Sequence, residues 1–379
     1  MENDHDRRKF IKNVGIGAAA IGTAGLASVL SSCKGQKQEE QVKTEEPKAK
    51  AIEWKMVTTW PPHFPMLGES ADKIAEWINE MSGGRLKITV YAGGELVPAL
   101  GAFDAVSEGT VEMGHSASYY WSGKCPAAQF FAAVPFGFNA QSINAWIYSG
   151  GGMELWEKLY APFNMKPFLA GNTGVQMGGW YNKEINSMAD FNGLKMRIPG
   201  LGGKILAKAG GNSVLMAGGE IYTNLERGVI DAAEWVGPFH DLKLGFHKAA
   251  KYYYYPGWHE LGTAFELMVN LKAWNSLPDD LKAIVSAATY KSNIWMLSEF
   301  EAKNNAALRE LIDVHKVQLK EFPEPVIKEL KKLSAEVLDE QAATDPAFKE
   351  VYESFLAFQK NIYGWNKMSE EPYQKLKYI

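Results

Sequence analysis

Hydrophobic and polar residues alternate along the chain with two periods, one typical of strands and one typical of helices. In residues 53–60 and 85–95, hydrophobic side chains recur at every second position, which predicts two strands. Between them, residues 66–84 place apolar side chains at helical spacing, and the Gly83–Gly84 pair ends the pattern. Residues 98–121 predict a helix followed by a short strand. The apolar residues that define the first helix are Ile74, Trp77, Ile78 and Met81. This order of strands and helices favours an α/β sheet with crossover helices.

The second half of the chain repeats this rhythm and then becomes helical. Strands are predicted at 166–173 and 175–182, and a long apolar strand is predicted within 263–274. Nearly everything from residue 278 to about 363 is predicted to be helical, with 279–316 as one helix of roughly 35 residues or more. Helices in globular proteins average about 10–14 residues. The long helix is therefore expected to brace two lobes or to pack against a partner chain.

The segment 171–184, GNTGVQMGGWYNKE, fits neither period. It is too rich in glycine for a helix interior and too polar for a buried strand. It carries Asn172, Gln176 and Trp180, and no charge before Lys183. We expect this ribbon to bend close to a small polar ligand.

Composition narrows the classes of function. The 379 residues carry a formal net charge of −4, and the lysines are spread over polar helix faces. Without a basic stripe, nothing indicates nucleic-acid binding. The 12 Trp, 16 Tyr and 18 Phe suit a large core and a pocket for a small organic ligand. Of the two cysteines, Cys125 is expected to be unpaired and to fill space as a small buried residue.

The N-terminus is predicted to be an export signal. Arg7, Arg8 and two nearby lysines precede an uncharged run of small residues from 13 to 32, which ends in LSSC. The paired arginines resemble a twin-arginine signal, and LSSC resembles a lipobox that would lipidate Cys33. The alternative is an ordinary membrane-anchor helix. Residues 34–51 are charged, lack aromatic side chains and predict a disordered tether. The folded part is expected to start near residue 52, outside the cytoplasmic membrane.

The usual catalytic signatures are missing from the sequence. It has no GxSxG, Walker loop, HExxH or CxxC motif. His259–Glu260 is the one notable pair of neighbours, but adjacent side chains rarely point to the same place. We therefore predict that the protein is not an enzyme, and keep an exported metal-dependent hydrolase or lyase as an alternative.

Four polar residues stand where predicted strands end or where the ribbon bends: Gln176, Arg197, Glu234 and Glu260. Ligands of open α/β sheets bind at the carboxyl ends of strands, and the planar fork of arginine matches a carboxylate. Taken singly, Arg197 could be a surface ion pair, Glu234 a solvated loop acid and Gln176 a turn cap. If the two glutamates converge in a dry cleft, their repulsion calls for a hard cation such as Ca²⁺ or Na⁺.

Four motifs in this order, behind an export signal, resemble a known family. They are GNTGVQMGGW, GLKMRIPG, EIYTNLERGVIDAAEWVGP and LGTAFELMVNLKAWNSLP. The chain is similar over most of residues 53–365 to the extracytoplasmic solute receptors of TRAP transporters, and closest to the branch that binds 2-oxo acids, lactate and similar monocarboxylates. The resemblance implies a two-lobed α/β fold like that of periplasmic binding proteins, with crossing strands and a long helix spanning the lobes. It also implies delivery of a small carboxylate to TRAP membrane permease subunits.

The resemblance assigns roles to single residues. Arg197 of the MRIPG motif would pair with the substrate carboxylate. A bridging Na⁺ or Ca²⁺ would be held by Gln176, Glu234, the backbone carbonyl of Trp235, and one further acid. Glu260 fits that last position best, although many members carry a proline after this acid where this chain has Leu261.

Three further residues complete the implied site. Glu266 is the second choice for the last metal ligand. Tyr120 is preferred to Tyr119 as the aromatic residue that closes the pocket, and Asn172 is an extra donor to the substrate. Gln176 and Trp235 would also touch the substrate.

The same reasoning predicts the domain organisation. Lobe 1 would comprise 52–173 and about 262–305; lobe 2 would comprise 174–261 and about 306–379, including the C-terminal helices. A homodimer through the long helix is a further prediction. A sensor subunit for a small organic acid is the alternative to a transport receptor.

Overall fold

The computed structural model describes residues 50–377. These residues belong to one compact unit. The predicted signal, the lipidation of Cys33 and nearly all of the predicted tether therefore lie outside the described residues. A search of the described helices finds none that is long and apolar enough to cross a membrane.

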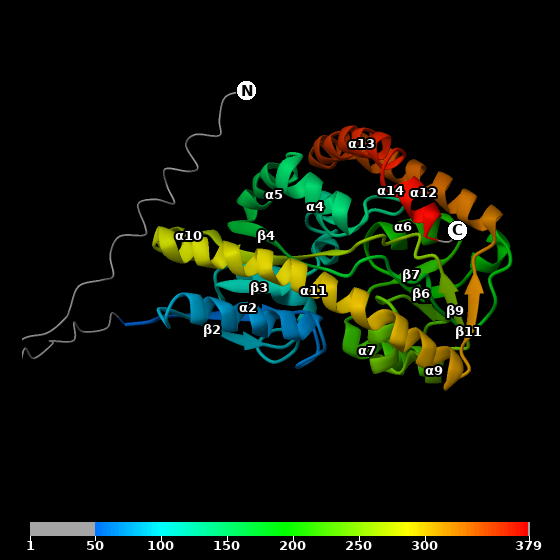
Figure 1. Cartoon of the computed structure of the whole chain (residues 1–379), viewed down its shortest axis with the longest axis horizontal. Coiled ribbons are helices and arrows are strands. Elements are labelled where there is room, and N and C mark those ends of the chain that lie inside the picture. The colour runs from blue at the N-terminus through cyan, green and yellow to red at the C-terminus, as the bar shows by residue number, and fades with distance from the viewer. Residues whose placement is uncertain (1–49, 378–379) are drawn as a thin grey trace, which may run out of the picture. The chain divides into compact units, whose positions relative to one another are not determined.

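Two separate sheets organise the described residues, as Figure 1 shows. The first has the order β2-β1-β3-β10-β4, in which β1 runs parallel to β2 and β3, and β10 runs antiparallel to β3 and β4. The second has the order β11-β9-β5-β8-β6-β7, with β5 antiparallel to its neighbours. The strands are β1 (Ile52–Thr58), β2 (Leu86–Tyr91), β3 (Met113–Ser116), β4 (Met165–Asn172), β5 (Gly179–Tyr181), β6 (Lys195–Arg197), β7 (Asn212–Val214), β8 (Ala232–Ala233), β9 (Tyr252–Tyr255), β10 (Ala264–Asn270) and β11 (Gln318–Glu321).

Helices cover both sheets, and the chain crosses between the sheets three times. The segments from β4 to β5 and from β9 to β10 connect one sheet to the other, and the third crossing is the long helix α11. The helices are α2 (Leu67–Met81), α3 (Ala102–Ser107), α4 (Ala140–Ser149), α5 (Gly152–Tyr160), α6 (Gly200–Lys208), α7 (Gly218–Glu226), α8 (Pro238–Leu244), α9 (Phe246–Ala249), α10 (Leu271–Ser276), α11 (Asp279–Asp313), α12 (Glu324–Thr344), α13 (Pro346–Asn366) and α14 (Glu370–Leu376). The predicted two-lobed α/β fold with crossing strands is confirmed.

The 35-residue helix α11 is the brace that the sequence predicts. Its first half packs on α2 and β4 of the first lobe, and its second half packs on α8 of the second (Figure 1). Asp279 and Asp280 occupy its first turn, where negative charge is favourable. Lys316 has a φ of 58° and lies in the left-handed region, so the helix ends before the predicted limit.

Three local expectations differ from the structure. The predicted helical stretch after residue 278 is interrupted by β11, which pairs in parallel with β9, and the next helix starts after its N-cap residue, Pro323. The predicted strand 175–182 is reduced to β5, since the preceding residues form the crossing. Met81, placed on the buried face of α2, is 44% exposed because it is the last residue of that helix.

The C-terminal helices do not all contact the second lobe. Helix α12 packs on α6 of that lobe, but α13 returns to the segment 126–160. There the ring of Phe355 lies 4.1 Å from that of Phe138 and 5.4 Å from that of Trp146. The burial of these aromatic rings stabilises the packing of α13 against the first lobe.

Cys125 is buried, and among residues 50–377 it forms no disulfide. Burial raises the pKa of its thiol to about 12. A thiol with so high a pKa is a poor nucleophile at neutral pH, which agrees with the expected role of filling space.

Candidate ligand-binding site

The four polar residues picked out by the sequence converge between the two sheets. Arg197 is the last residue of β6, and Glu234 follows β8, the strand beside it. Gln176 and Glu260 lie on the two chain crossings, where the backbone N–H of Gln176 donates to the carbonyl of Glu260 at 3.1 Å. All four side chains are at most 3% exposed. Strand ends and crossings thus meet in one dry location, as expected for this type of sheet.

Arg197 is the centre of a hydrogen-bonded cluster. Its Nη1 donates to the Glu234 carboxylate and, at 3.1 Å, to the Glu234 backbone carbonyl. Its Nη2 donates to the hydroxyl of Tyr120 at 3.2 Å, and its guanidinium lies 5.1 Å from the centre of the Trp235 ring. Burial disfavours the charged guanidinium, but Glu234, the two tyrosines and Glu260 together outweigh this effect and raise the pKa of Arg197. The arginine is therefore a fixed positive charge in a buried location.

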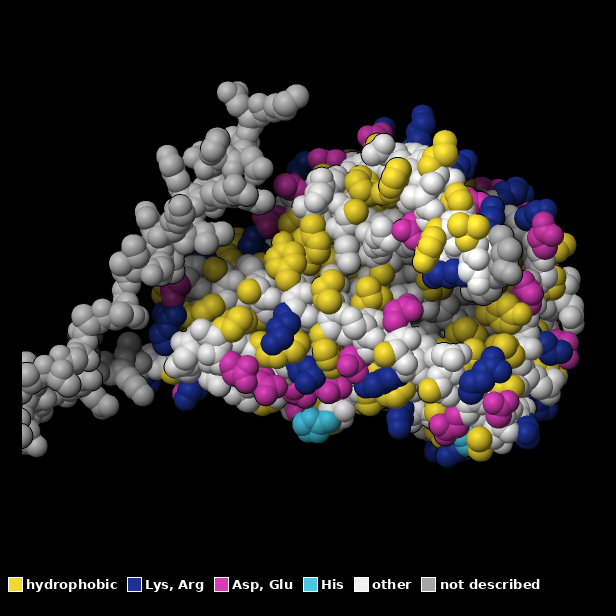
Figure 2. All heavy atoms as spheres, viewed as in Figure 1, with side chains coloured by type: hydrophobic (Ala, Val, Ile, Leu, Met, Phe, Trp, Pro, Cys, Tyr) yellow, Lys and Arg dark blue, Asp and Glu magenta, His cyan; other side chains and the backbone are white. Residues whose placement is uncertain are grey.

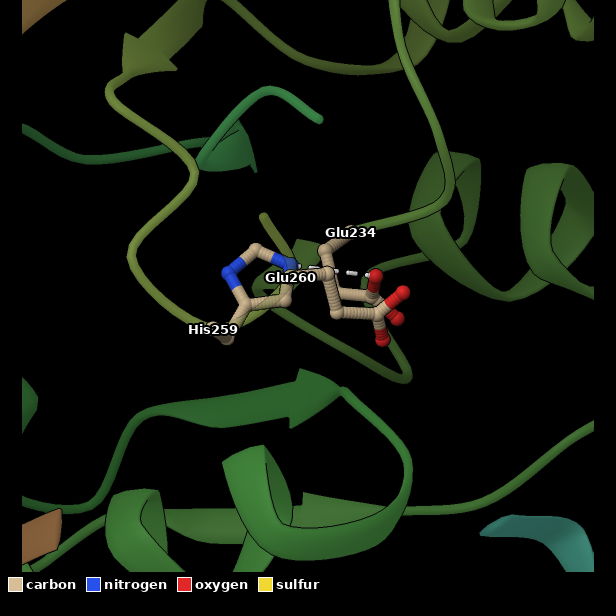
Figure 3. Close-up of side chains that lie close together, drawn as sticks. All are labelled: Glu234, His259 and Glu260. Carbon is tan, nitrogen blue, oxygen red and sulfur yellow. Dashed lines mark hydrogen bonds and ion pairs between the residues drawn. The ribbon is translucent and has the colours of Figure 1, made fainter. Parts of the chain in front are cut away.

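Glu234, His259 and Glu260 form the acidic side of the cluster, as Figure 3 shows. Each offers one ligand atom, and these atoms all lie within 4.8 Å of one another. His259 Nε2 is 3.2 Å from Glu234 Oε2, and Glu260 accepts a hydrogen bond from the Thr263 hydroxyl. Burial, and then the charge of Glu234, raise the pKa of Glu260 well above its ordinary value. Two carboxyl groups this close in a dry location repel each other when both are ionised.

Gln176 is joined to this cluster through the Thr263 hydroxyl, which also donates to Glu260. Its Nε2 donates to the hydroxyls of Thr263 at 2.9 Å and Thr173 at 3.2 Å, which fixes the orientation of the amide. Its Oε1 is buried, and within the described part of the chain it has no hydrogen-bond partner. The orphaned oxygen of Gln176 and the paired carboxylates of Glu234 and Glu260 are the oxygen donor types that a hard cation takes.

The glycines of the ribbon are explained by close approach of the backbone. A Cβ at Gly178 would lie 2.4 Å from the Phe322 ring, and one at Gly179 would lie 2.8 Å from the Ala233 carbonyl oxygen. Gly179 also has a φ of 104°, which L-residues rarely adopt. Across the site, a Cβ at Gly257 would meet the Gln176 carbonyl oxygen at 2.2 Å. The glycines let the two crossings pass side by side and bring Gln176 to the cluster.

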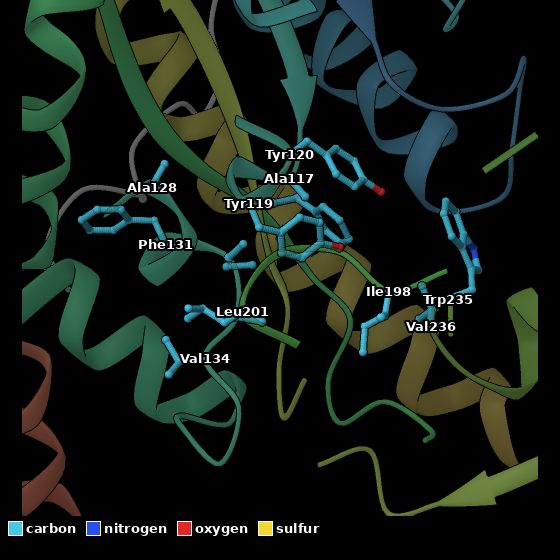
Figure 4. Close-up of a cluster of buried hydrophobic side chains, with 14 of the residues drawn as sticks. Ala117, Tyr119, Tyr120, Ala128, Phe131, Val134, Ile198, Leu201, Trp235 and Val236 are labelled. Atoms are coloured by element: carbon cyan, nitrogen blue, oxygen red, sulfur yellow. The ribbon is translucent and has the colours of Figure 1, made fainter. Parts of the chain in front are cut away.

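Two neighbouring tyrosines close one side of the site, and only one of them reaches the arginine. Figure 4 shows Tyr119 and Tyr120 on the first lobe, with Trp235 on the opposite side. The two tyrosine rings are 4.9 Å apart and nearly perpendicular. The hydroxyl of Tyr120 accepts from Arg197, whereas Tyr119 packs near the backbone of Gly200.

Two other predicted residues lie apart from the cluster. The Nδ2 of Asn172 donates to the Gly262 carbonyl at 3.3 Å, and its Oδ1 accepts from the Gly174 N–H at 2.8 Å. Glu266 accepts from Trp121 Nε1 at 2.6 Å and from the Tyr160 hydroxyl at 2.7 Å, and burial raises its pKa to about 7. Glu260, not Glu266, is therefore the acid that stands beside Glu234.

Sequence reasoning missed His259 and the two threonines that orient Gln176. His259 was set aside because adjacent residues rarely converge. Here the backbone of the second crossing turns both His259 and Glu260 toward Glu234 (Figure 3). The available signal was the His-Glu pair itself, in a segment without regular periodicity between two strands.

Two α/β lobes joined by crossing strands, with a buried arginine and paired carboxylates between them, define a receptor that encloses a small charged ligand. The chain belongs to the bacterial extracellular solute-binding proteins of family 7, whose model matches residues 56–345. The predicted membership among TRAP solute receptors is thereby confirmed, and the family consists of transport receptors of the periplasm.

Individual relatives agree with this assignment. The chain is 47% identical to the monocarboxylate 2-oxoacid-binding periplasmic protein of Nostoc sp. (strain PCC 7120), over 95% of this chain and 96% of that protein. It is 46% identical to a TRAP periplasmic solute-binding protein from Colwellia psychrerythraea with bound calcium and pyruvate (TM-score 0.84, 86% of this chain and 99% of that one). It is 43% identical to one from Pseudoalteromonas atlantica with bound sodium and pyruvate (TM-score 0.84, 86% and 99%).

Proposed function

We propose that this chain binds a 2-oxo acid such as pyruvate together with Ca²⁺ or Na⁺ and delivers it to TRAP membrane permease subunits. The observation that carries the proposal is the buried meeting of the Glu234 and Glu260 carboxylates, with the unpartnered oxygen of Gln176 on the adjoining crossing. The relatives with bound pyruvate and a cation give the same pairing of ligand and metal.

The roles of the residues follow from charge. Gln176, Glu234, Glu260 and the Trp235 carbonyl would hold the cation through oxygen atoms. Arg197 would hold the substrate carboxylate in a bidentate pair, with Tyr120 beside it. Two glutamates and an anionic substrate are balanced by the arginine and a divalent cation, whereas a monovalent cation leaves one negative charge uncompensated. The cation thus lets a buried acidic site accept an anion.

Calorimetric titration of pyruvate in the presence of Ca²⁺ or Na⁺ tests this function. We expect binding, and at 100 times the dissociation constant the ligand should stabilise the fold by about 2.7 kcal/mol. Acetate lacks the oxo oxygen that would complete the cation's shell, so it should bind more weakly. Absence of binding by pyruvate, lactate and related short acids with either cation would refute the proposal.

We propose further that the protein is exported by the twin-arginine route and lipid-anchored through Cys33. The basis is the paired arginines and LSSC in the sequence. A Cys33→Ala variant is expected to leave the membrane fraction and appear as free protein, because it has no site for the lipid. If the variant stays with membranes through high-salt and carbonate washing, the anchor assignment is wrong.

A homodimer is also proposed; the sequence prediction places its interface on the long helix α11, and the C-terminal helices α13 and α14 offer a second surface for it. Exposed apolar side chains gather on α13, α14 and the turn between them: Tyr363, Trp365, Met368, Tyr373 and Leu376. Figure 2 shows hydrophobic side chains interspersed with charged ones on this face of the molecule. Such a patch is typical of a protein interface. Sedimentation velocity should show a dimer that Trp365→Glu dissociates; a monomeric wild type would contradict it.

A further inference from the structure

The two lobes are joined by a hydrogen bond that involves none of the proposed ligand-binding residues. His240 lies on α8, between β8 and β9 of the second sheet, and is fully buried. Its Nε2 is 2.6 Å from the carbonyl oxygen of Pro65, which lies between β1 and α2 of the first lobe. Because a carbonyl only accepts, Nε2 carries the hydrogen and donates it. Burial lowers the pKa of His240 to about 3, so the ring is neutral at physiological pH.

The second-lobe side of this contact is rigid. The residue after His240 is Asp241, whose Oδ2 accepts from Trp180 Nε1 at 2.9 Å and from the Tyr253 hydroxyl at 2.6 Å. Trp180 and Tyr253 belong to the adjacent strands β5 and β9. Helix α8 is thus tied to the second sheet, and His240 moves with that sheet.

The first-lobe side is a strained turn. The N–H of Leu67 donates to the same Pro65 carbonyl at 2.7 Å, and the intervening Met66 has a φ of 57° and a ψ of −54°. These angles approach those of the three-residue turn with positive φ, which is rare and strained. Met66 is fully buried. Strained backbone persists where the surroundings hold it, and it is concentrated at switch regions.

Aromatic rings connect this contact to the proposed ligand site. The Phe64 ring lies 4.6 Å from the His240 ring and 6.2 Å from the Trp235 ring. Trp235 in turn stands over the guanidinium of Arg197. The other side of His240 packs against Phe300 of α11, at 4.7 Å. A separation of the lobes would break the hydrogen bond and loosen the packing of Trp235.

We propose that His240 is a positioning residue that holds the receptor closed: by donating to Pro65 it fixes the turn 65–67 of the first lobe against the second lobe and slows release of the enclosed ligand. The inference rests on the proposed function for the ligand. The hydrogen bond from His240 to Pro65, called the latch below, does not itself contact the ligand. Its expected effect is on retention and not on recognition.

Three substitutions separate the hydrogen bond from packing. His240→Phe keeps a ring and removes the donor. His240→Gln keeps a donor at a reach similar to that of Nε2, whereas His240→Asn carries the same amide on a shorter side chain that falls short of Pro65. The control is His63→Gln, since His63 lies on the same loop and its side chain is 90% exposed.

The measurements are the dissociation rate of pyruvate with Ca²⁺, by stopped-flow tryptophan fluorescence, and hydrogen–deuterium exchange of the amides of residues 64–70 without ligand. His240→Phe and His240→Asn should raise the dissociation rate about three- to tenfold, the range expected for loss of one hydrogen bond, and speed the exchange. The association rate should change less. His240→Gln should restore both readouts, and His63→Gln should match the wild type.

Two results would overturn the latch. One is unchanged release and exchange in both His240→Phe and His240→Asn. The other is a His240→Gln variant as impaired as His240→Asn, which would make the residue's role one of packing alone. If the wild type does not bind pyruvate, the proposed function fails, while the exchange comparison still decides the latch.

Discussion

Replacing Arg197 with lysine is expected to weaken pyruvate binding by about 2–5 kcal/mol, or roughly 30- to 5,000-fold. The substitution keeps the positive charge but replaces a planar fork by a single ammonium group, which cannot form the bidentate pair with a carboxylate. The site is at most a few per cent exposed, so water does not compensate for the lost geometry. The planar fork also donates to Glu234 and Tyr120 from separate nitrogens, an arrangement that a single ammonium nitrogen does not reproduce.

Isothermal titration of pyruvate at a fixed, saturating Ca²⁺ concentration measures this loss. Arg227→Lys is the matched control, because Arg227 is an exposed residue of the same lobe. The control should bind like the wild type. An Arg197→Lys variant that retains the wild-type dissociation constant would remove Arg197 from substrate recognition.

Removing the cation is expected to weaken pyruvate binding at least about 100-fold, because an uncompensated buried charge costs about 3–5 kcal/mol. Without a cation, Glu234 and Glu260 face the substrate carboxylate with only Arg197 to oppose three negative charges. The pKa of Glu260, already raised by burial and by Glu234, shows how unfavourable a second ionised carboxylate is in this site. A bound cation makes ionisation of both groups favourable.

The test is titration of pyruvate into protein stripped of metal, in buffer free of Na⁺ and Ca²⁺, followed by addition of each cation separately. Restoration by one cation and not the other identifies the physiological ion. Glu234→Gln should behave like the stripped protein, since it removes one charged ligand. Glu301→Gln, an exposed change near the glycine ribbon, should have no effect. Full affinity in the stripped protein would exclude the metal from the mechanism.

Local periodicity and motif content explain why so much of the fold could be predicted. The strands at 53–60 and 85–95, the helix at 66–84 and the long helix from Asp279 all appear close to their expected limits. Each of these elements buries one face in its own lobe. Its hydrophobic residues therefore recur with a regular period along the sequence. The strand β11 was missed because it is four residues long and half exposed, at the edge of a sheet, where no alternation is required.

The residue types of the site, the order of strands and helices, and the family can all be predicted from the order of amino acids. Which of these residues meet depends on the folded chain. Glu260 is preferred to Glu266 only through the family resemblance; in the structure Glu260 lies on the crossing beside Glu234, whereas Glu266 lies within β10 and bonds to Trp121 and Tyr160. The contact of His240 with Pro65 joins residues 175 positions apart. Neither the helical nor the strand periodicity of the sequence predicts it. Hydrophobic periodicity shows which face of a helix or strand is buried. Whether residues from different segments meet depends on how the two crossings place those segments in the fold.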